Sequence, residues 1–347
     1  MEQGSEKGYL GDILLQPAAL EATYASLSKS FSLRDIPQRL QAGEFRRILL
    51  TGMGSSHFIF YPLFYALSQQ PVPVTQIEAS ELVHYAPELI KKDTLVITAS
   101  QSGSSAETVR LLELCQQQNC CVLGITNTAD SPLARHADVV VMTEAGVEAT
   151  VSCKTYVSAL LALRWVEAAL LGSDLEAVKA ETKQAADLVK AYLVNWQGHV
   201  EFFKQELKGS HNYFMTGRGP SLAAVGTGSL TVKESTLMHA EGLSCAALRH
   251  GPKEMMRSGV FVLVFAGLDK TRQLNKNLKD ELIAQGANVL WVDAKEGLGA
   301  CRIPACPNGL LPIMEILPTE MFNLALAAMN DHTAGVFEHA SKITNKE

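Results

Sequence analysis

Short apolar runs alternate with helical segments through the first half of the chain. A short, continuous apolar run is typical of a parallel strand that is covered on both faces. Between the second and third runs, residues 105–118 carry apolar side chains at helical spacing. Alternating strands and helices predict an α/β protein with a doubly wound parallel sheet. The predicted strands are Arg47–Thr51, Leu95–Ala99, Val122–Thr126 and Val139–Met142.

The second half of the chain repeats this plan. Thr51-Gly52 ends the first predicted strand, and Thr216-Gly217 ends another predicted strand 165 residues later. Residues 262–265 and 289–292 follow at about the distances that separate the corresponding strands of the first half. Similarity at one fixed interval indicates a duplicated unit. We therefore expect two tandem parallel-sheet domains.

The remaining segments are predicted to be helical and set the expected domain limits. Residues 160–205 contain few Gly or Pro and predict helices that join the two halves. The expected organisation is a helical lead-in, a first domain that binds phosphate, a second domain that carries acid–base residues, and a C-terminal helix with a tail. These four parts are residues 1–44, 45–190, 191–326 and 327–347.

A serine-rich loop, Ser100-Gln101-Ser102-Gly103-Ser104-Ser105, stands between the second predicted strand and the helix after it. The first amides of a helix have no partner inside the helix and can bind an anion, and hydroxyl groups can donate to phosphate oxygens. Gly103 would let the backbone approach the anion closely. The alternative is a simple helix cap, which needs only one hydroxyl. The loop therefore predicts a phosphate site.

A second hydroxyl-bearing loop, Gly54-Ser55-Ser56, follows the first predicted strand. In open α/β sheets, ligands bind beyond the carboxyl ends of the strands, where the strand order reverses. We expect both loops to lie at that edge. The equivalent loop of the second half, residues 265–269, has lost the hydroxyl cluster, so the first half is expected to hold the phosphate.

Acid–base candidates lie in the second half. On a helix through residues 233–241, Glu234, Leu237, Met238 and Glu241 would share one side. Burial of a carboxylate beside apolar side chains raises its pKa toward that of a useful general base. The alternative is a solvent-facing helix with ordinary charges, and the spacing by itself favours that alternative.

Two further catalytic candidates lie outside this predicted helix. His250 precedes Gly251-Pro252 and is expected on a turn, where many catalytic groups lie. Lys342, near the end of the sequence, could pair with a substrate carbonyl if its segment folded over a pocket. The alternative for Lys342 is an ordinary solvated charge.

Composition narrows the classes of function. A net charge of −6 argues against nucleic-acid binding, which normally needs a basic patch. The seven cysteines form no C-x-x-C pair, and no G-x-G-x-x-G follows the first strand, so we expect neither a metal nor a dinucleotide cofactor. We found no signal-like start and no apolar run of roughly 18 residues. We expect a cytoplasmic protein that does not interact with membranes.

These motifs resemble those of the sugar isomerase (SIS) domain family, in particular the isomerase half of glucosamine-6-phosphate synthase and its free-standing relatives. Residues 100–103 are identical to the start of the family's S-Q-S-G-E-T phosphate loop, and residues 54–56 resemble its G-T-S loop. The family's K-E…H-A-E…K-H-G-P motif resembles residues 233–252, and its terminal A-K-S-V-T-V-E segment resembles residues 341–347.

The resemblance implies a role for each matching residue. Glu234 would move a proton between C1 and C2 of a phosphorylated sugar, His250 would assist ring opening, and Lys342 would contact the open-chain carbonyl. It also implies a homodimer with a shared active site, to which the neighbouring subunit contributes the histidine loop. The implied substrate- and phosphate-binding residues are Gly54, Ser56, Ser100, Gln101, Ser102, Gly103, Ser105 and Val151.

Departures from the family pattern limit the expected reaction. Thr231 stands where the synthase has a second lysine, and residues 146–154 keep an E…V…K pattern in a shorter loop. No glutaminase half is present in the sequence, so we expect isomerisation coupled to release of ammonia or of an amino acid from a 6-phosphorylated amino sugar or fructosamine-type adduct. The alternatives are a regulatory SIS protein that binds a sugar phosphate without catalysis and a simple aldose–ketose phosphosugar isomerase.

Overall fold

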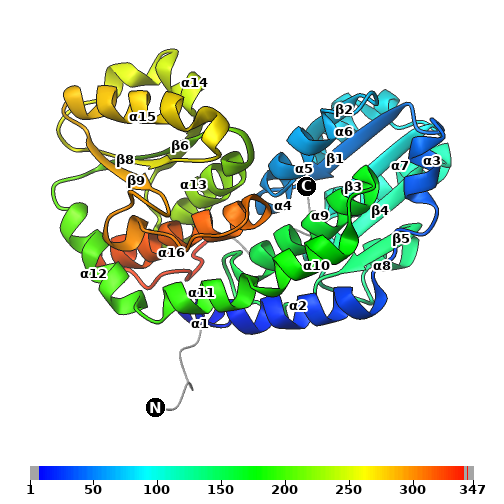
Figure 1. The fold of residues 1–347 in the computed structure, drawn as a ribbon, viewed down its shortest axis with the longest axis horizontal. Helices are drawn as coiled ribbons and strands as arrows, with labels where there is room; N and C mark the ends of the chain where they lie inside the picture. The colour runs from blue at the N-terminus through cyan, green and yellow to red at the C-terminus, as the bar shows by residue number, and fades with distance from the viewer. Residues whose placement is uncertain (1–7, 340–341, 343–347) are drawn as a thin grey trace. The chain divides into compact units, whose positions relative to one another are not determined.

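All named strands in the described part of the chain, residues 8–339 and Lys342 of a computed structural model, belong to two separate parallel sheets (Figure 1). The sheets lie in two compact units. The first unit contains residues 18–148 and 154–184 together with Lys342, and the second contains residues 8–17, 149–153 and 185–339. Each unit is made of segments that are not consecutive in the sequence. The domain limits taken from the sequence, which assume continuous domains, therefore remain predictions.

The sheet of the first unit has the strand order β2-β1-β3-β4-β5, and all its neighbouring pairs are parallel. Each residue of β3 and β4 is buried, as expected for central strands covered on both faces. The order reverses at β1, which lies between β2 and β3. The strands are β1 (Arg47–Gly52), β2 (Val74–Glu78), β3 (Thr94–Ala99), β4 (Cys121–Thr126) and β5 (Val139–Met142).

Helices pack on both faces of this first sheet. On one face, Leu82, Leu111 and Leu133 of α6, α7 and α8 pack in a single cluster with apolar strand residues. On the other face, α5 contacts β1 and α9 contacts β4. The helices that belong wholly to this unit are α3 (Ile36–Gln41), α4 (Ser55–Phe58), α5 (Phe60–Leu67), α6 (Ala79–Tyr85), α7 (Ala106–Gln118), α8 (Pro132–His136), α9 (Lys154–Leu171) and α10 (Leu175–Lys183).

The sheet of the second unit has the order β7-β6-β8-β9, again with parallel pairs only. This order matches β2-β1-β3-β4 strand for strand, which confirms the predicted duplication and the α/β fold class. Thr51-Gly52 and Thr216-Gly217 indeed end equivalent strands, β1 and β6. The strands are β6 (Asn212–Gly217), β7 (Ala240–Ser244), β8 (Val260–Phe265) and β9 (Asn288–Val292).

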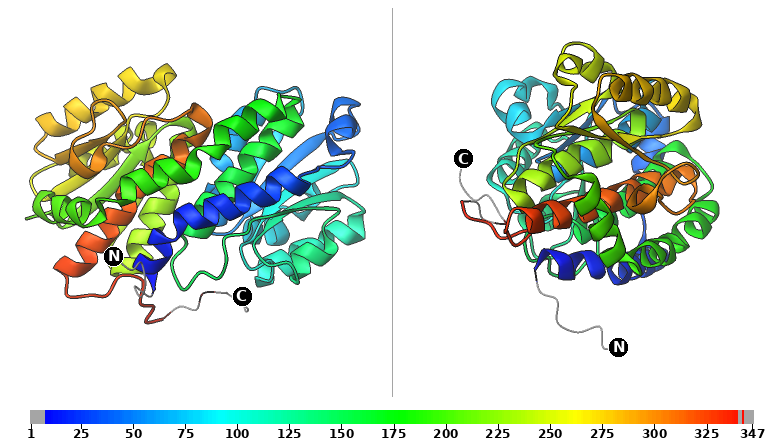
Figure 2. Two further views of the ribbon diagram at one scale, coloured as in Figure 1. Left: turned by 60° about the horizontal axis from the view of Figure 1, so that its bottom comes forward. Right: turned by 90° about the vertical axis from the view of Figure 1, so that its left-hand side faces the viewer.

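Helices also cover both faces of the second sheet (Figure 2). Leu248 of α14 and Leu282 of α15 pack with Val262 of β8 on one face. On the other face, the Phe322 ring of α16 contacts the rings of Phe203 and Phe261. The helices here are α11 (Ala185–Leu193), α12 (Trp196–Glu206), α13 (Leu222–Thr236), α14 (Cys245–Arg249), α15 (Asp269–Ala284) and α16 (Leu311–Met329), with α1 (Tyr9–Leu14) near the start of the chain.

Helix α16 is long and apolar enough to span a membrane by length and composition alone. In the structure, however, 89% of its apolar window is buried within the protein. It is therefore a core helix of the second unit. The cytoplasmic location expected from the sequence remains a prediction.

The expected helices at both ends of the first domain are confirmed. The lead-in contains α1, α2 (Gln16–Ser30) and α3, and residues 160–205 lie in four helices, α9 to α12. The prediction of a C-terminal helix from residue 327 onward is wrong in its position, because α16 begins at Leu311 and ends at Met329. The edge strands β2 and β7 escaped prediction because they are only half-buried and lack an apolar run.

Candidate functional site

The serine-rich loop joins β3 to α7 and folds around Gly103. This glycine has a φ of 61°, and a Cβ atom there would lie 2.2 Å from Ser131 Oγ, so only glycine fits. The Gly103 amide donates a hydrogen bond to Ser100 Oγ at 3.1 Å. The Ser104 amide donates to Ser102 Oγ at 3.3 Å. The loop therefore has a defined, compact conformation.

Residues that follow β4 hold the backbone of Gln101 in place. Its carbonyl oxygen accepts hydrogen bonds from the Asn127 amide at 3.1 Å, from Thr126 Oγ1 at 3.3 Å and from Thr128 Oγ1 at 3.2 Å. Three donors on one oxygen fix the peptide plane between Gln101 and Ser102. Such preorganisation is useful in a site that must bind an anion.

Ser105 is the N-cap of α7. Its Oγ accepts from the Thr108 amide at 3.4 Å and lies 2.8 Å from Thr108 Oγ1. The simple cap considered from the sequence is therefore present, and it needs only this one hydroxyl. Within the described residues, the amides of Ser102 and Ser105 donate no hydrogen bond to the protein. These amides, at the positive end of a 13-residue helix, are available to an anion.

The second loop leaves the same edge of the sheet. Strands β1 and β3 are neighbours with Thr51 opposite Thr98, so the expectation that both loops share an edge is confirmed. A Cβ atom on Gly52 would lie 2.7 Å from the Ser56 carbonyl oxygen and 2.9 Å from that of Ala99, so the two loops approach closely only because residue 52 is glycine.

The start of α4 places the hydroxyl of Ser56. Gly54 precedes this helix with a φ of 52°, another conformation that favours glycine. Ser56 is half-buried, and its amide donates to the Met53 carbonyl oxygen at 3.0 Å. The strand order reverses at β1, so both loops lie at the topological switch point of the first sheet.

The helix expected over residues 233–241 is shorter than predicted. Helix α13 ends at Thr236, Leu237 has a φ of 58°, and Ala240 begins β7. The Thr236 side chain helps to end the helix, because its Oγ1 donates to the Val232 carbonyl oxygen at 2.7 Å and accepts the Met238 amide at 3.1 Å.

The prediction that Glu234, Leu237, Met238 and Glu241 share one helical face is therefore wrong. Only Glu234 lies on α13, in its last turn, where it is half-buried. Glu241 lies on β7 instead, opposite Phe214 of β6. Desolvation of Glu234 thus depends on tertiary neighbours and not on the apolar residues that follow it in the sequence.

A buried uncharged network occupies the helix turn before Glu234. Asn323 Nδ2 donates to Thr231 Oγ1 at 3.0 Å and to the Tyr9 hydroxyl at 3.1 Å. Burial raises the pKa of Tyr9 well above 10, and the negative charges of Glu320 and, to a smaller extent, Glu234 raise it further. Tyr9 therefore remains protonated at neutral pH. Thr231 stands where the synthase has its second lysine, so uncharged hydrogen-bonding groups occupy this position in the present chain.

His250 lies on a turn, as predicted. It is exposed and directly follows α14, and its amide donates to the Ala247 carbonyl oxygen at 3.0 Å. The turn is tied to α15 because Arg249 and Lys253 each donate to Glu281 at 2.6 Å. The position is therefore well defined, whereas the catalytic role of His250 remains a prediction.

The other two predicted residues have different surroundings. Lys342 Nζ lies 2.5 Å from Glu148 Oε2 within the first unit. Val151 is 1% exposed, so a ligand would meet its backbone and not its side chain. Of the predicted residues, the structure groups those of the two serine loops at one sheet edge, and it places Glu234 and His250 on elements of the second unit.

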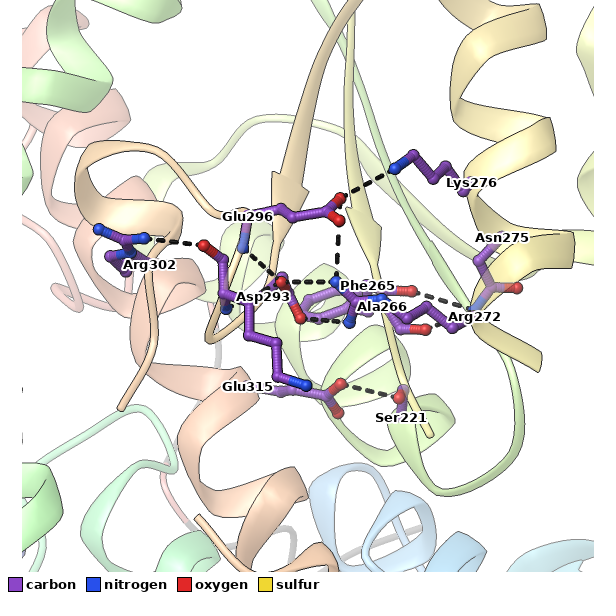
Figure 3. A network of polar contacts seen from close by, with 11 residues as sticks. Ser221, Phe265, Ala266, Arg272, Asn275, Lys276, Asp293, Glu296, Arg302 and Glu315 are labelled. Carbon is purple, nitrogen blue, oxygen red and sulfur yellow. Dashed lines mark hydrogen bonds and ion pairs between the residues drawn. The ribbon is translucent and has the colours of Figure 1, made fainter. Parts of the chain in front are cut away.

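The second unit contains a buried carboxylate that sequence reasoning missed. Ser221 Oγ donates to Glu315 Oε1 at 2.8 Å, next to the loop that follows β8 (Figure 3). Burial raises the pKa of Glu315 to about 8, although bonds from Ser221 and the Gly267 amide oppose this shift. This loop is the counterpart of the serine-rich loop, so the second unit directs its own acidic side chain to the equivalent position. The signal in the sequence was an acidic residue inside an apolar helix.

A strong ion pair stabilises the same edge of the second sheet. Arg272 binds both carboxylate oxygens of Asp293, at 2.5 and 2.7 Å (Figure 3). Burial alone would raise the pKa of Asp293, but Arg272 and the amides of Lys295 and Glu296 outweigh burial and lower it to about 2. The carboxylate therefore remains charged at neutral pH.

The order β7-β6-β8-β9 repeats β2-β1-β3-β4, and a serine-rich loop lies at the switch point of the first sheet. These features define a class of α/β proteins built from two doubly wound parallel sheets. Residues 44–166 match the SIS domain family. This segment contains the first sheet and is similar to a SIS domain, and the second sheet repeats the topology of the matched one.

Two archaeal proteins are similar to nearly the whole chain. The isomerizing glutamine–fructose-6-phosphate aminotransferases of Pyrococcus horikoshii and Thermococcus kodakarensis are 28% and 29% identical over 96% and 95% of this chain. The chain spans only 57% and 58% of their lengths.

Solved structures share the fold over nearly the whole chain. The C-terminal domain of glucosamine-fructose-6-phosphate aminotransferase from Francisella tularensis has a TM-score of 0.85 at 22% identity, with 98% of this chain and 100% of that chain covered. Glucosamine-6-phosphate deaminase from Thermotoga maritima has a TM-score of 0.78 at 20% identity, with 97% and 99% covered.

Proposed function

We propose that this protein is a phosphosugar isomerase that acts on a 6-phosphorylated amino sugar or a fructosamine-type adduct and releases ammonia or an amino acid. The observation that carries the proposal is the serine-rich loop at the switch point. It combines hydroxyl groups, two unoccupied amides and a helix N-terminus on a fixed backbone. A phosphate monoester fits these donors better than a neutral ligand does.

The phosphate would be bound by Ser100, Gln101, Ser102 and Ser105, together with Ser56 and the backbone at Gly54, Gly103 and Val151. Glu234 would take a proton from one carbon next to the carbonyl or imine group and return it to the other. His250 would assist ring opening, and Lys342 would stabilise the negative charge that develops on the oxygen. The reaction requires that one substrate contact both the serine loop and Glu234.

The names of the relatives favour this chemistry. The portion of the aminotransferases that the chain matches is little more than half of their length, and one structural relative is a deaminase of glucosamine 6-phosphate. We also propose a homodimer in which the neighbouring subunit contributes the histidine loop, as the family resemblance implies.

Proton exchange with solvent tests the proposal directly. The protein is incubated in D₂O with amino-sugar 6-phosphates and fructosamine 6-phosphates, and label at C1 or C2 is followed by NMR while free ammonia and amino acids are assayed. We expect both label and amine release with at least one substrate. Label without amine release would indicate a simple aldose–ketose isomerase, and binding without label would indicate a regulatory protein.

The Glu234→Gln variant tests the assigned base. We expect turnover to fall by ~100-fold or more while phosphosugar binding persists, because the amide keeps the shape of the side chain but accepts no proton. Glu241→Gln is the matched control, since Glu241 lies on β7 and not on α13. Normal turnover by Glu234→Gln would exclude Glu234 as the base.

A further inference from the structure

Lys342 contacts a buried carboxylate of the first unit. Its Nζ atom lies 2.5 Å from Glu148 Oε2, and the two residues are 194 positions apart in the sequence. The Glu148 side chain is 0% exposed and that of Lys342 is 24% exposed. Removing the cationic partner of a buried carboxylate costs free energy, so this contact strongly restricts where the lysine can lie.

The carboxylate also accepts hydrogen bonds from groups other than Lys342. Glu148 Oε2 accepts Thr155 Oγ1 at 2.7 Å, and Oε1 accepts the Thr155 amide at 3.0 Å. Lys154 Nζ donates to the Val147 carbonyl oxygen at 2.6 Å and so closes the loop in front of α9. The Glu148 side chain therefore has one orientation, with Oε2 directed at Lys342.

Hydrogen bonds connect this loop to the serine-rich loop within the same unit. The Asn127 amide donates to the Gln101 carbonyl oxygen at 3.1 Å. The Asn127 side chain donates to the Gly146 carbonyl oxygen at 2.8 Å and accepts the Ala145 amide at 2.8 Å. Asn127 thus fixes the loop that carries Glu148 relative to the residues that would bind phosphate.

We propose that Glu148 is a positioning residue that sets Lys342 at a defined place relative to the phosphate loop. This inference rests on the proposed function, in which Lys342 contacts the open-chain carbonyl. It adds the residue that makes the position of the lysine reproducible. Without the carboxylate, Lys342 would lose this ion pair, and its Nζ atom would be placed less precisely relative to the oxygen of the reacting substrate.

Chemical labelling tests the contact without any need for catalysis. The intact protein is treated with limiting N-acetoxysuccinimide, and acetylation of each lysine is timed by mass spectrometry. We expect Lys342 to react more slowly in the wild type than in Glu148→Gln, whereas exposed Lys270 reacts at one rate in both. Equal rates at Lys342 in the two proteins would overturn the proposal.

A double-mutant cycle tests whether Glu148 acts through Lys342. With a substrate found by the exchange assay, we expect Glu148→Gln to lower kcat by ~10- to 100-fold with little change in KM, because a misplaced catalytic group slows the chemical step. In the Lys342→Met background the same change should have almost no further effect on kcat. An equal loss in both backgrounds would overturn the proposal.

Asp12→Asn is the matched control. Asp12 is a buried carboxylate that accepts the amide of the next loop residue, Ala149, at 2.6 Å. A loss of kcat in Asp12→Asn as large as that in Glu148→Gln would mean that general loop integrity matters and not the position of Lys342. If no phosphosugar is turned over by the wild type, the proposed function fails, while the labelling result still decides the contact.

Discussion

Replacing Glu315 with Gln should remove a large part of the pH dependence of stability. The pKa of this carboxyl group rises from 4.5 to about 8 on folding because the group is buried. The folded protein therefore binds more protons than the unfolded chain between these two values. Stability contributed by the protonated group is fully present below pH 4.5 and is lost as the pH rises through about 8.

The magnitude follows from the size of the shift. A difference of about 3.5 between the two pKa values corresponds to at most ~5 kcal/mol, at ~1.4 kcal/mol for each pKa unit. Gln cannot ionise and keeps an oxygen that can accept the Ser221 hydroxyl. We expect the variant to match the wild type within ~1 kcal/mol at pH 5 and to exceed it by ~2 kcal/mol or more at pH 8.5.

Urea unfolding at pH 5, 7 and 8.5 measures this difference, with fluorescence and circular dichroism as two independent probes of unfolding. Ser221→Ala is a useful companion variant. It removes a hydrogen bond that lowers the pKa of Glu315 in the folded protein, so its loss of stability should still begin near pH 4.5 but continue to a higher pH than in the wild type. Parallel stability curves for the wild type and Glu315→Gln across this range would refute the reasoning.

Two other substitutions test local geometry. Gly103→Ala should weaken phosphosugar binding by ~10-fold or more and lower stability by ~1–3 kcal/mol, because the new Cβ atom would meet Ser131 Oγ and the φ of 61° is unfavourable for alanine. Calorimetric titration and thermal unfolding measure these effects, and unchanged binding would contradict the assigned role of the loop. Leu237→Gly should raise stability by ~0.5–1 kcal/mol, since Leu237 is exposed and has a φ of 58°. A lower midpoint of urea unfolding would show that the Leu237 side chain contributes more than the strain costs.

Local pattern predicted most of the two sheets. Strands such as β3 and β8 are buried on both faces, so most of their residues are apolar and the strands can be recognised in the sequence. The serine-rich loop was also predictable, because the carboxyl ends of parallel strands must meet at one edge. Strands β2 and β7 were not, since half-exposed edge strands carry polar residues that resemble loop sequence.

Contacts between distant segments decided the chemistry around the candidate site. The end of α13 depends on the pairing of Ala240 with Tyr213, which no helical periodicity contains. The raised pKa of Glu315 arises from burial in a core formed by segments far apart in the chain. The pair of Glu148 and Lys342 joins residues 194 positions apart. Sequence therefore determined the buried strands and the serine-rich loop, because these depend on local patterns of polarity. Only tertiary structure determined which charges are buried and which partners they have, because desolvation and ion pairing are properties of packed neighbours.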